Sequence, residues 1–148
     1  EGGFYREIHR SPHRVQRVSP NGDPSTLRQA STCIYYLLEG GQVSKLHRLD
    51  SEETWHFHLG EPLSLFLLYP DGRLEEKRLG PDIESGESLF AIIPDGIWFG
   101  ARLPRVQGFS LVTCTVSPGF EFQDFEIATG ERLLETFPEH KEIIQMLS

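Results

Sequence analysis

Short runs of alternating or continuous hydrophobic residues, separated by glycine and proline turns, fill most of the sequence. Side chains alternate between the two faces of a β-strand, and β-branched and aromatic residues favour strands, so each run predicts a strand. Pro-Asp-Gly sequences at 70–72 and 94–96 are typical of turns between paired strands. The expected strands cover residues 4–9, 32–39, 43–47, 54–59, 63–69, 73–79, 88–93, 97–102, 108–116 and 122–126.

Two parts of the chain depart from this pattern. Residues 11–26 are dense in Pro, Gly, Asn and Asp, which predicts a long loop with a short strand at 15–18. A loop of this length in a compact domain is often a lid or a binding loop. After Gly130 the apolar residues recur at helical spacing, and Pro138 divides the segment. The sequence therefore predicts two short C-terminal helices or one kinked helix.

Many short strands, spaced roughly 8–12 residues apart, are typical of an all-β sandwich or barrel. The 148 residues suffice for one domain with a substantial core, and we expect a single domain over residues 1–148. Strands do not alternate with helices, and the stretch GESLFAIIPDG lacks the lysine of a phosphate-binding P-loop. A nucleotide-binding α/β fold is therefore not expected.

Charge and cysteine content narrow the class of protein further. The chain has 14 basic and 22 acidic residues, a formal net charge of −8, which disfavours nucleic acid or an anionic membrane as partner. No run of about 18 apolar residues is present that could span a bilayer. Cys33 and Cys114 lie in apolar runs, where they could form a disulfide or stay buried as free thiols. We expect free thiols and a reducing, cytoplasmic location.

Candidate chemistry concentrates in residues 40–60, GGQVSKLHRLDSEETWHFHLG. From Gly41 the spacing is Gly-x5-His-x-Leu-x3-Glu-x6-Gly. This resembles the first signature of the cupin superfamily, Gly-x5-His-x-His-x3/4-Glu-x6-Gly, which supplies three metal ligands inside a β-barrel. His47 and Glu53 stand at two of these positions, whereas Leu49 occupies the second histidine position and cannot bind a metal.

The second cupin signature is matched more loosely. Gly86, Pro94 and Gly96 follow it with two extra residues, and Phe99 stands at its histidine position. A narrower resemblance, to one uncharacterised cupin branch, covers nearly the whole chain. Its blocks are EGGFYRE, STCIYYLL, SKLHRLDSEETWHFHLGEPL, PDGIWFGAR and VSPGFEFQDFE. This resemblance implies a small jelly-roll barrel, usually homodimeric, with a cavity for a small molecule, and a chain that begins inside the first block of the family.

His47 and Glu53 are the candidate catalytic residues. By strand alternation Glu53, Trp55 and Phe57 share one face, and the resemblance places Glu53 inside the barrel with His47 on the neighbouring strand. The pair could supply an acid and a base, form half of a metal site, or be a structural hydrogen-bonded pair. We take His47 as a general base that Glu53 orients.

The candidate ligand-binding residues are Trp55, Phe57, Trp98, Phe99 and Arg102. Aromatic faces can stack on sugars or flat rings, and we expect the two tryptophans to form an apolar wall of the cavity. An inward arginine can bind an anionic group through two hydrogen bonds. Each residue also has a structural interpretation, as core for the aromatic rings and as an outward charge for the arginine.

Other conspicuous residues are assigned to the surface. His56 and His58 form a His-x-His on the face opposite Glu53, a spacing that can chelate zinc, but a surface or dimer-interface pair is the preferred interpretation. Glu121, Asp124 and Glu126 are expected at the rim of the barrel mouth. We predict no bound metal and no other cofactor.

Residues 63–69, LSLFLLY, are apolar on both faces. Such a strand must be covered on its outer side by a second sheet or a second subunit. We therefore predict a homodimer with this run at or beneath the interface.

Three functions remain open. The first is a metal-independent epimerase or isomerase that acts on a small, sugar-like molecule with His47 as base. The second is a non-catalytic protein that binds or stores a small ligand. The third, a metal-dependent cupin enzyme, is disfavoured because Leu49 and Phe99 replace two imidazole ligands.

Overall fold

The computed structural model describes residues 1–18 and 24–148. Its strands and helices follow the predicted runs closely, and the C-terminal segment divides at Pro138 as expected. The strands are β1 (Phe4–Arg10), β2 (Arg14–Val18), β3 (Pro24–Gln29), β4 (Thr32–Glu39), β5 (Val43–Leu49), β6 (Glu52–Gly60), β7 (Leu63–Leu68), β8 (Leu74–Leu79), β9 (Phe90–Ile93), β10 (Trp98–Arg102), β11 (Phe109–Ser117) and β12 (Phe125–Ile127). The helices are η1 (Phe122–Asp124), α1 (Gly130–Thr136), η2 (Pro138–His140) and α2 (Lys141–Met146).

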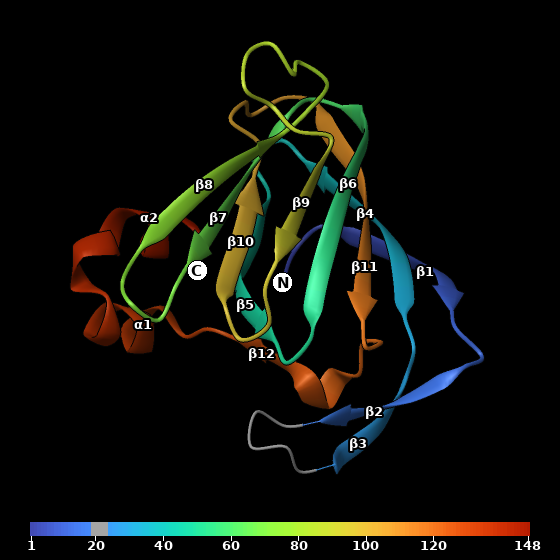
Figure 1. Ribbon diagram of the computed structural model, residues 1–148. Helices are drawn as coiled ribbons and strands as arrows, with labels where there is room; N and C mark the ends of the chain where they lie inside the picture. The colour runs from blue at the N-terminus through green and yellow to red at the C-terminus, as the bar shows by residue number, and fades with distance from the viewer. Residues whose placement is uncertain (19–23) are drawn as a thin grey trace.

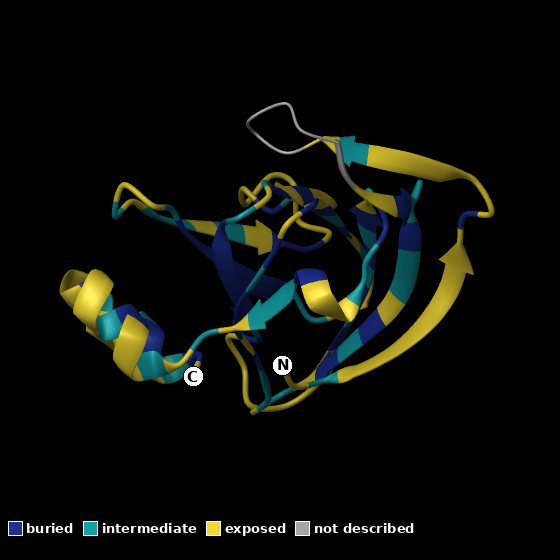
Figure 2. Ribbon diagram, turned by 90° about the horizontal axis from the view of Figure 1, so that it is seen from below, coloured by how far each residue is buried: buried dark blue, intermediate teal, exposed yellow. Residues whose placement is uncertain are grey.

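Two five-stranded antiparallel sheets face each other (Figures 1 and 2). One has the strand order β1-β4-β11-β6-β9 and the other β12-β5-β10-β7-β8. Most neighbouring strands within each sheet are distant in sequence, so the chain repeatedly crosses from one sheet to the other. This is the jelly-roll sandwich that the strand pattern predicts, with short helices at the C-terminal end.

The predicted loop at 11–26 differs from the structure. Residues 14–18 and 24–29 form an antiparallel hairpin, β2-β3, that stands apart from the two large sheets (Figure 1). The short strand predicted at 15–18 is confirmed as β2. The strand β3 was not predicted, because the Pro, Asn, Gly and Asp residues at 20–24 favour a turn. The remaining part of the predicted loop, residues 19–23, lies outside the described residues.

The main hydrophobic core lies between the two sheets. Inward side chains of both sheets meet there, among them Tyr36, Trp55, Leu65, Phe99 and Val112, each at most 2% exposed. Tyr36 and Trp55 pack edge to face, with ring centroids 5.4 Å apart. This packing closes one part of the sandwich and leaves the rest for a cavity.

A second hydrophobic cluster joins the C-terminal helices to the outside of β7. Phe66 and Leu68, on its outer face, pack with Leu133, Phe137 and other apolar residues of the helical segment. The helices lie outside this sheet (Figure 2). The run at 63–69 is therefore covered on both faces, as predicted, but by the chain's own helices. Its outer face is thus covered without a partner, and the homodimer with this run near or beneath the interface stays a prediction.

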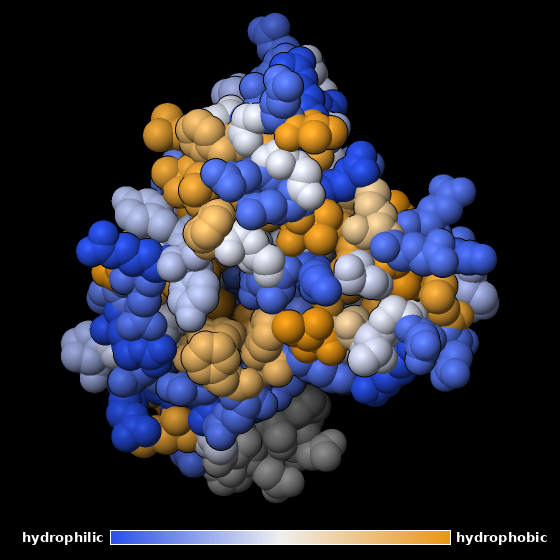
Figure 3. All heavy atoms as spheres, turned by 180° about the vertical axis from the view of Figure 1, so that it is seen from behind, coloured by the Kyte–Doolittle hydropathy of each residue, from blue (hydrophilic) through white to orange (hydrophobic). Residues whose placement is uncertain are grey.

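Both cysteines are free, as expected, with Cys114 buried and Cys33 half-buried. On the face seen from behind, hydrophobic residues are scattered between hydrophilic ones (Figure 3). Scattered apolar side chains are ordinary on a protein surface. None of the helices formed by residues 1–18 and 24–148 is long and apolar enough to cross a membrane.

Truncating Leu133 to alanine should test the role of the helices. Leu133 is 2% exposed within the second cluster, so Leu133→Ala should lower the free energy of unfolding by about 2–5 kcal/mol through lost contacts and a residual cavity. Chemical denaturation followed by circular dichroism measures the change. Glu135→Ala, on the exposed side of the same helix, should change it by less than about 0.5 kcal/mol. Equal effects of the two substitutions would contradict the packing role.

Candidate functional site

A cavity of about 400 Å³ opens between the sheets, beside the N-terminal segment and the turn that contains η1. A volume of this size suits a small organic molecule. Its lining combines carboxyl, imidazole and guanidinium groups with apolar walls. The lining residues are Glu1, Gly2, Gly3, Tyr5, Glu7, Arg10, Thr32, Ile34, His47, Leu49, Glu53, Cys114, Val116, Phe120, Glu121, Phe122 and Phe125.

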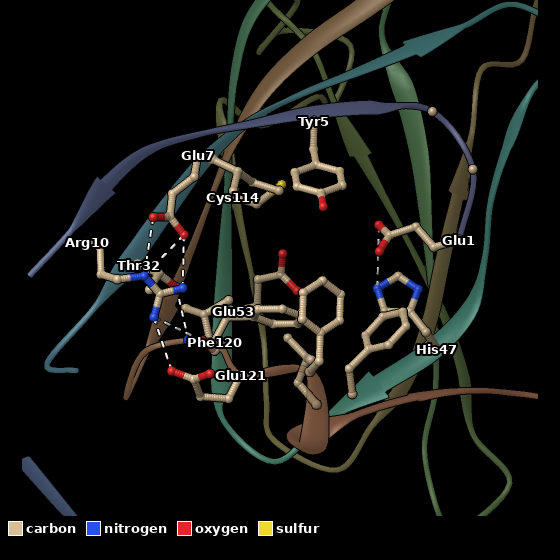
Figure 4. Close-up of a pocket in the computed structure, with 17 residues that line it drawn as sticks. Glu1, Tyr5, Glu7, Arg10, Thr32, His47, Glu53, Cys114, Phe120 and Glu121 are labelled. Atoms are coloured by element: carbon tan, nitrogen blue, oxygen red, sulfur yellow. Dashed lines mark hydrogen bonds and ion pairs between the residues drawn. The ribbon is translucent and has the colours of Figure 1, made fainter. Parts of the chain in front are cut away.

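His47 lies on β5 and is only 2% exposed. Its Nδ1 is 2.6 Å from the carbonyl oxygen of Lys45, and because a carbonyl only accepts, Nδ1–H is the donor. In the neutral ring Nε2 therefore carries the lone pair. Nε2 lies 4.0 Å from Oε1 of Glu1, beyond hydrogen-bond distance, on the cavity side of the ring (Figure 4). Burial lowers the pKa of His47, so the ring is neutral at neutral pH.

Glu53 lies on β6, 6% exposed, and points into the same cavity (Figure 4). Burial raises the pKa of Glu53 to about 8, and the nearby Glu1 carboxylate acts in the same direction. The carboxyl group is therefore largely protonated at neutral pH and can donate a hydrogen bond. Cys114 lines the cavity beside it, and burial raises the pKa of this thiol well above its usual value. The thiol is accordingly un-ionised.

Arg10 is held between two carboxylates of the lining. Its Nε and Nη2 donate to Glu7, the shortest distance being 2.9 Å, and its Nη1 donates to Oε1 of Glu121 at 3.1 Å. Figure 4 shows this arrangement on the side of the cavity away from His47. A bulge in β1 between Glu7 and His9 allows the side chain of Arg10 to face the cavity. The extra residue reverses the alternation, so Arg10 faces the cavity opposite Thr32 while His9 pairs with Cys33.

A buried ion pair fixes the turn at the cavity mouth. Arg28 of β3 binds Asp124 of η1 through two hydrogen bonds, from Nε at 2.7 Å and from Nη2 at 2.8 Å, with both side chains 6% exposed. The hydrogen bonds from Arg28 lower the pKa of Asp124. Phe122 and Phe125, on either side of Asp124, line the cavity. The β2-β3 hairpin thus positions an aromatic part of the mouth.

The amino-acid sequence of this chain matches a known protein family and a yeast protein. The family model described as "Cupin superfamily (DUF985)" matches residues 1–128. This chain belongs to that cupin family. An uncharacterised protein of Saccharomyces cerevisiae, YML079W, is 31% identical over 140 residues, which cover 88% of this chain and 69% of the yeast protein.

Solved structures show the same relationship. A hypothetical protein from Leishmania major superimposes with a TM-score of 0.90 and 37% identity, over 100% of this cupin and 90% of that chain. Protein SO0799 from Shewanella oneidensis gives a TM-score of 0.86 and 42% identity, over 99% and 86%. Oxalate decarboxylase from Bacillus subtilis shares the fold alone, at a TM-score of 0.62 and 16% identity, over 100% of this chain and 35% of that one.

The donor set of this cupin does not fit the metal centre of the superfamily's signatures. Leu49 lines the cavity at one ligand position, and Phe99, at another, packs its ring 4.1 Å from that of His47. Among residues 1–18 and 24–148 no group of three or more His, Cys, Asp or Glu side chains could hold a metal ion. His47 and Glu53 remain, and two ligands make a weak site.

The five predicted ligand-binding residues lie outside the cavity lining, which corrects the expected apolar wall. Trp55 and Phe99 are buried in the main core, and Phe57 packs against it. Trp98 and Arg102 belong to the opposite side of their sheet. There Trp98 packs in the second cluster. The guanidinium carbon of Arg48 lies over the Trp98 ring, 4.6 Å from the ring centre. Nη1 of Arg102 lies 2.7 Å from the sulfur of Met146 in α2.

The two catalytic candidates do share the cavity, but the expected orienting contact differs. The carbonyl of Lys45, and not Glu53, holds the His47 ring. His56 and His58 lie on the exposed outer face, where His56 stacks on Phe90 and His58 bonds to Thr113.

Sequence reasoning missed most of the remaining lining. Glu7 is one of the strand charges that could point inward, although the sequence favours an outward position for it, and Tyr5 follows from the same alternation along β1. Arg10 could not be predicted, because no sequence signal marks the bulge. Glu121 was expected near the mouth, but its aromatic neighbours Phe120 and Phe122 were not singled out.

Glu53 should make the stability of this cupin depend on pH. Above about pH 4.5 the unfolded chain releases the Glu53 proton, whereas the folded chain keeps it until about pH 8. Rising pH across this window therefore favours unfolding. Glu53→Gln removes the effect, so the stability of this variant relative to wild type should grow from pH 4.5 to 8, by on the order of 4 kcal/mol. Urea denaturation across this range measures the difference.

Glu52→Gln is the matched control, because Glu52 is the exposed neighbour on the same strand. It should show no growing difference from wild type. A Glu53→Gln difference that stays constant with pH would mean that Glu53 ionises normally in the folded protein.

Proposed function

We propose that this cupin isomerises or epimerises a small, polyhydroxylated, carbonyl-bearing molecule without a metal, with His47 as the general base. One observation carries the proposal: a buried neutral imidazole presents its unprotonated nitrogen to the same cavity as a buried, protonated carboxyl group. Pairs of titratable groups whose environments separate their protonation states in this way suit acid and base roles. The cavity volume of about 400 Å³ accommodates a molecule of sugar size.

The reaction would use the two groups in turn. Nε2 of His47 accepts the proton from the carbon next to the carbonyl, while the carboxyl of Glu53 donates its proton to the carbonyl oxygen, which gives an enol. When the enol turns over within the cavity, return of the proton from His47 to the opposite face of that carbon gives the epimer. Its return to the neighbouring carbon gives the isomer. Glu53 recovers its proton from the hydroxyl that it protonated when the epimer forms. When the isomer forms, it takes the proton from the hydroxyl on the carbon that His47 deprotonated, which becomes the new carbonyl, so protons and electrons balance in both cases.

A non-catalytic binding protein is the alternative function. It is favoured by the apolar share of the lining, which includes Ile34, Leu49 and Val116, and by the full burial of His47. In that case the imidazole and carboxyl would only hydrogen-bond a resident ligand. We retain a homodimer and a cytoplasmic location as further predictions, testable by sedimentation at micromolar concentration and by localising a tagged protein.

Replacing His47 tests the catalytic proposal. Incubation with a panel of aldoses and ketoses in D₂O, followed by NMR, should reveal deuterium at the carbon next to the carbonyl of the substrate. His47→Gln should reduce this exchange by about 10²- to 10⁴-fold, because glutamine cannot accept the proton. The fold is checked by circular dichroism of the same sample.

His56→Gln is the matched control, since His56 lies on the outer face of the same protein and should exchange at the wild-type rate. Exchange by His47→Gln at nearly the wild-type rate would make His47 structural. Binding of a sugar without any exchange by the wild type would favour the alternative function.

A further inference from the structure

The proposed function does not specify the charge of the ligand. The charged groups that line the cavity indicate which sign of charge they would bind. We propose that the cavity selects a ligand that carries an ammonium group, and that an amino sugar is the substrate class. The sugar part of this inference rests on the proposed function. The ammonium part rests on the arrangement of Glu1, Glu7, Glu121 and Arg10 and on the aromatic mouth.

The lining has an excess of negative charge. Its carboxyl groups belong to Glu1, Glu7, Glu53 and Glu121, and Arg10 is the sole arginine or lysine among the described lining residues. With His47 and Glu53 neutral, the side chains of the lining place three carboxylates against one guanidinium, which leaves at least one negative charge in excess once the backbone ammonium of Glu1 is counted. A cation entering the cavity therefore meets a favourable potential, and an anion an unfavourable one.

Arg10 is not available to an anionic ligand. Nε and Nη2 are engaged by Glu7, and Nη1 by Glu121 and by the carbonyl oxygen of Phe120 at 3.5 Å. All three nitrogens of the guanidinium are thus directed at protein acceptors. A phosphate or carboxylate that bound the guanidinium through two hydrogen bonds would have to displace one of the two glutamates, which would then lose its partner.

Acceptors on the opposite side of the cavity are less occupied. Oε1 of Glu1 receives a long hydrogen bond of 3.4 Å from Ser44 and lies 4.0 Å from Nε2 of His47. The Glu1 side chain is 29% exposed, so its carboxylate is partly withdrawn from bulk water, where a contact with a cation is stronger. An ammonium group placed here would donate to Glu1 and leave Nε2 of His47 free.

The mouth adds a second feature that favours cations. Phe120, Phe122 and Phe125 all line the cavity, and Phe120 packs against the other two at ring separations of 5.1 Å and 6.0 Å. The faces of aromatic rings attract cations, most strongly where water is partly excluded. Carboxylates and aromatic rings around one cavity are the combination that recognises organic ammonium ions.

Three sugars of matched shape test the inference: glucosamine, glucose and glucuronate, titrated into the full chain at about pH 6.5, where the amine is protonated. We expect glucosamine to bind at least about tenfold more tightly than glucose, and glucuronate to show no measurable binding at ~10 mM. Calorimetry or NMR titration gives the affinities. Raising the salt concentration from about 50 mM to about 500 mM should reduce the preference.

The double variant Glu7→Gln/Glu121→Gln should reverse the selection. It removes two negative charges and releases the Arg10 guanidinium, so the preference for glucosamine should fall at least about tenfold and glucuronate should begin to bind. Glu131→Gln/Glu142→Gln, on the exposed C-terminal helices, changes the net charge equally and should keep the wild-type preference. Melting temperatures of both variants show that each remains folded.

Equal affinity for glucose and glucosamine, tighter binding of glucuronate, or no binding of glucosamine at ~10 mM would overturn the inference. These outcomes are separate from a failure of the proposed function. A wild-type protein that exchanges deuterium into an uncharged sugar, with loss of exchange in His47→Gln, would support the acid and base roles while refuting the ammonium selection. Binding of glucosamine without exchange would support the selection alone.

Discussion

The alternation of side chains along the strands is the constraint on which the core and the cavity both depend. On β6 it turns Glu53 and Trp55 inward, so one strand supplies a titratable group to the cavity and a large aromatic ring to the core. On β1 a single extra residue reverses it and brings Arg10 to the inner face. Because the period is two, any one-residue slip would exchange the cavity groups for the outer surface.

Burial of ionisable groups at this end of the sandwich carries a cost that the structure meets in two ways. The charge of the buried Arg28 is offset by the Asp124 carboxylate at hydrogen-bond distance, and the more exposed Arg10 is bound by Glu7 and Glu121. His47 and Glu53 instead become neutral, because desolvation outweighs the attraction between His47 and the Glu1 carboxylate at 4.0 Å, and because the same carboxylate disfavours a charge on Glu53. Groups of the second kind can exchange protons with a ligand near neutral pH, whereas groups of the first kind hold the walls and the mouth in place.

The sequence predicts the fold well because its strands carry strong local signals. Glycine and proline turns bound them, and the first cupin signature resembles this chain in spacing as well as composition. It also predicts that His47 and Glu53 share the barrel interior. It does not predict the ligand wall, because Trp98 and Arg102 lie on a strand with both faces buried, and polarity alone does not indicate which face is inner. Similarly, the apolar run of β7 indicated an outer cover but could not distinguish a partner from the chain's own helices.

The two departures from the cupin metal signature have a joint chemical consequence. Leu49 and Phe99 replace donor side chains with apolar ones, and Phe99 and Phe125 place their rings 4.1 Å and 5.3 Å from the imidazole. These groups remove water from His47 and offer no negative charge in its place, which is the desolvation that lowers its pKa. A histidine kept neutral, with Nδ1–H fixed on a backbone carbonyl, presents the lone pair of Nε2 to the cavity. The substitutions that remove the metal ligands therefore also create the conditions under which the remaining histidine can act as a base.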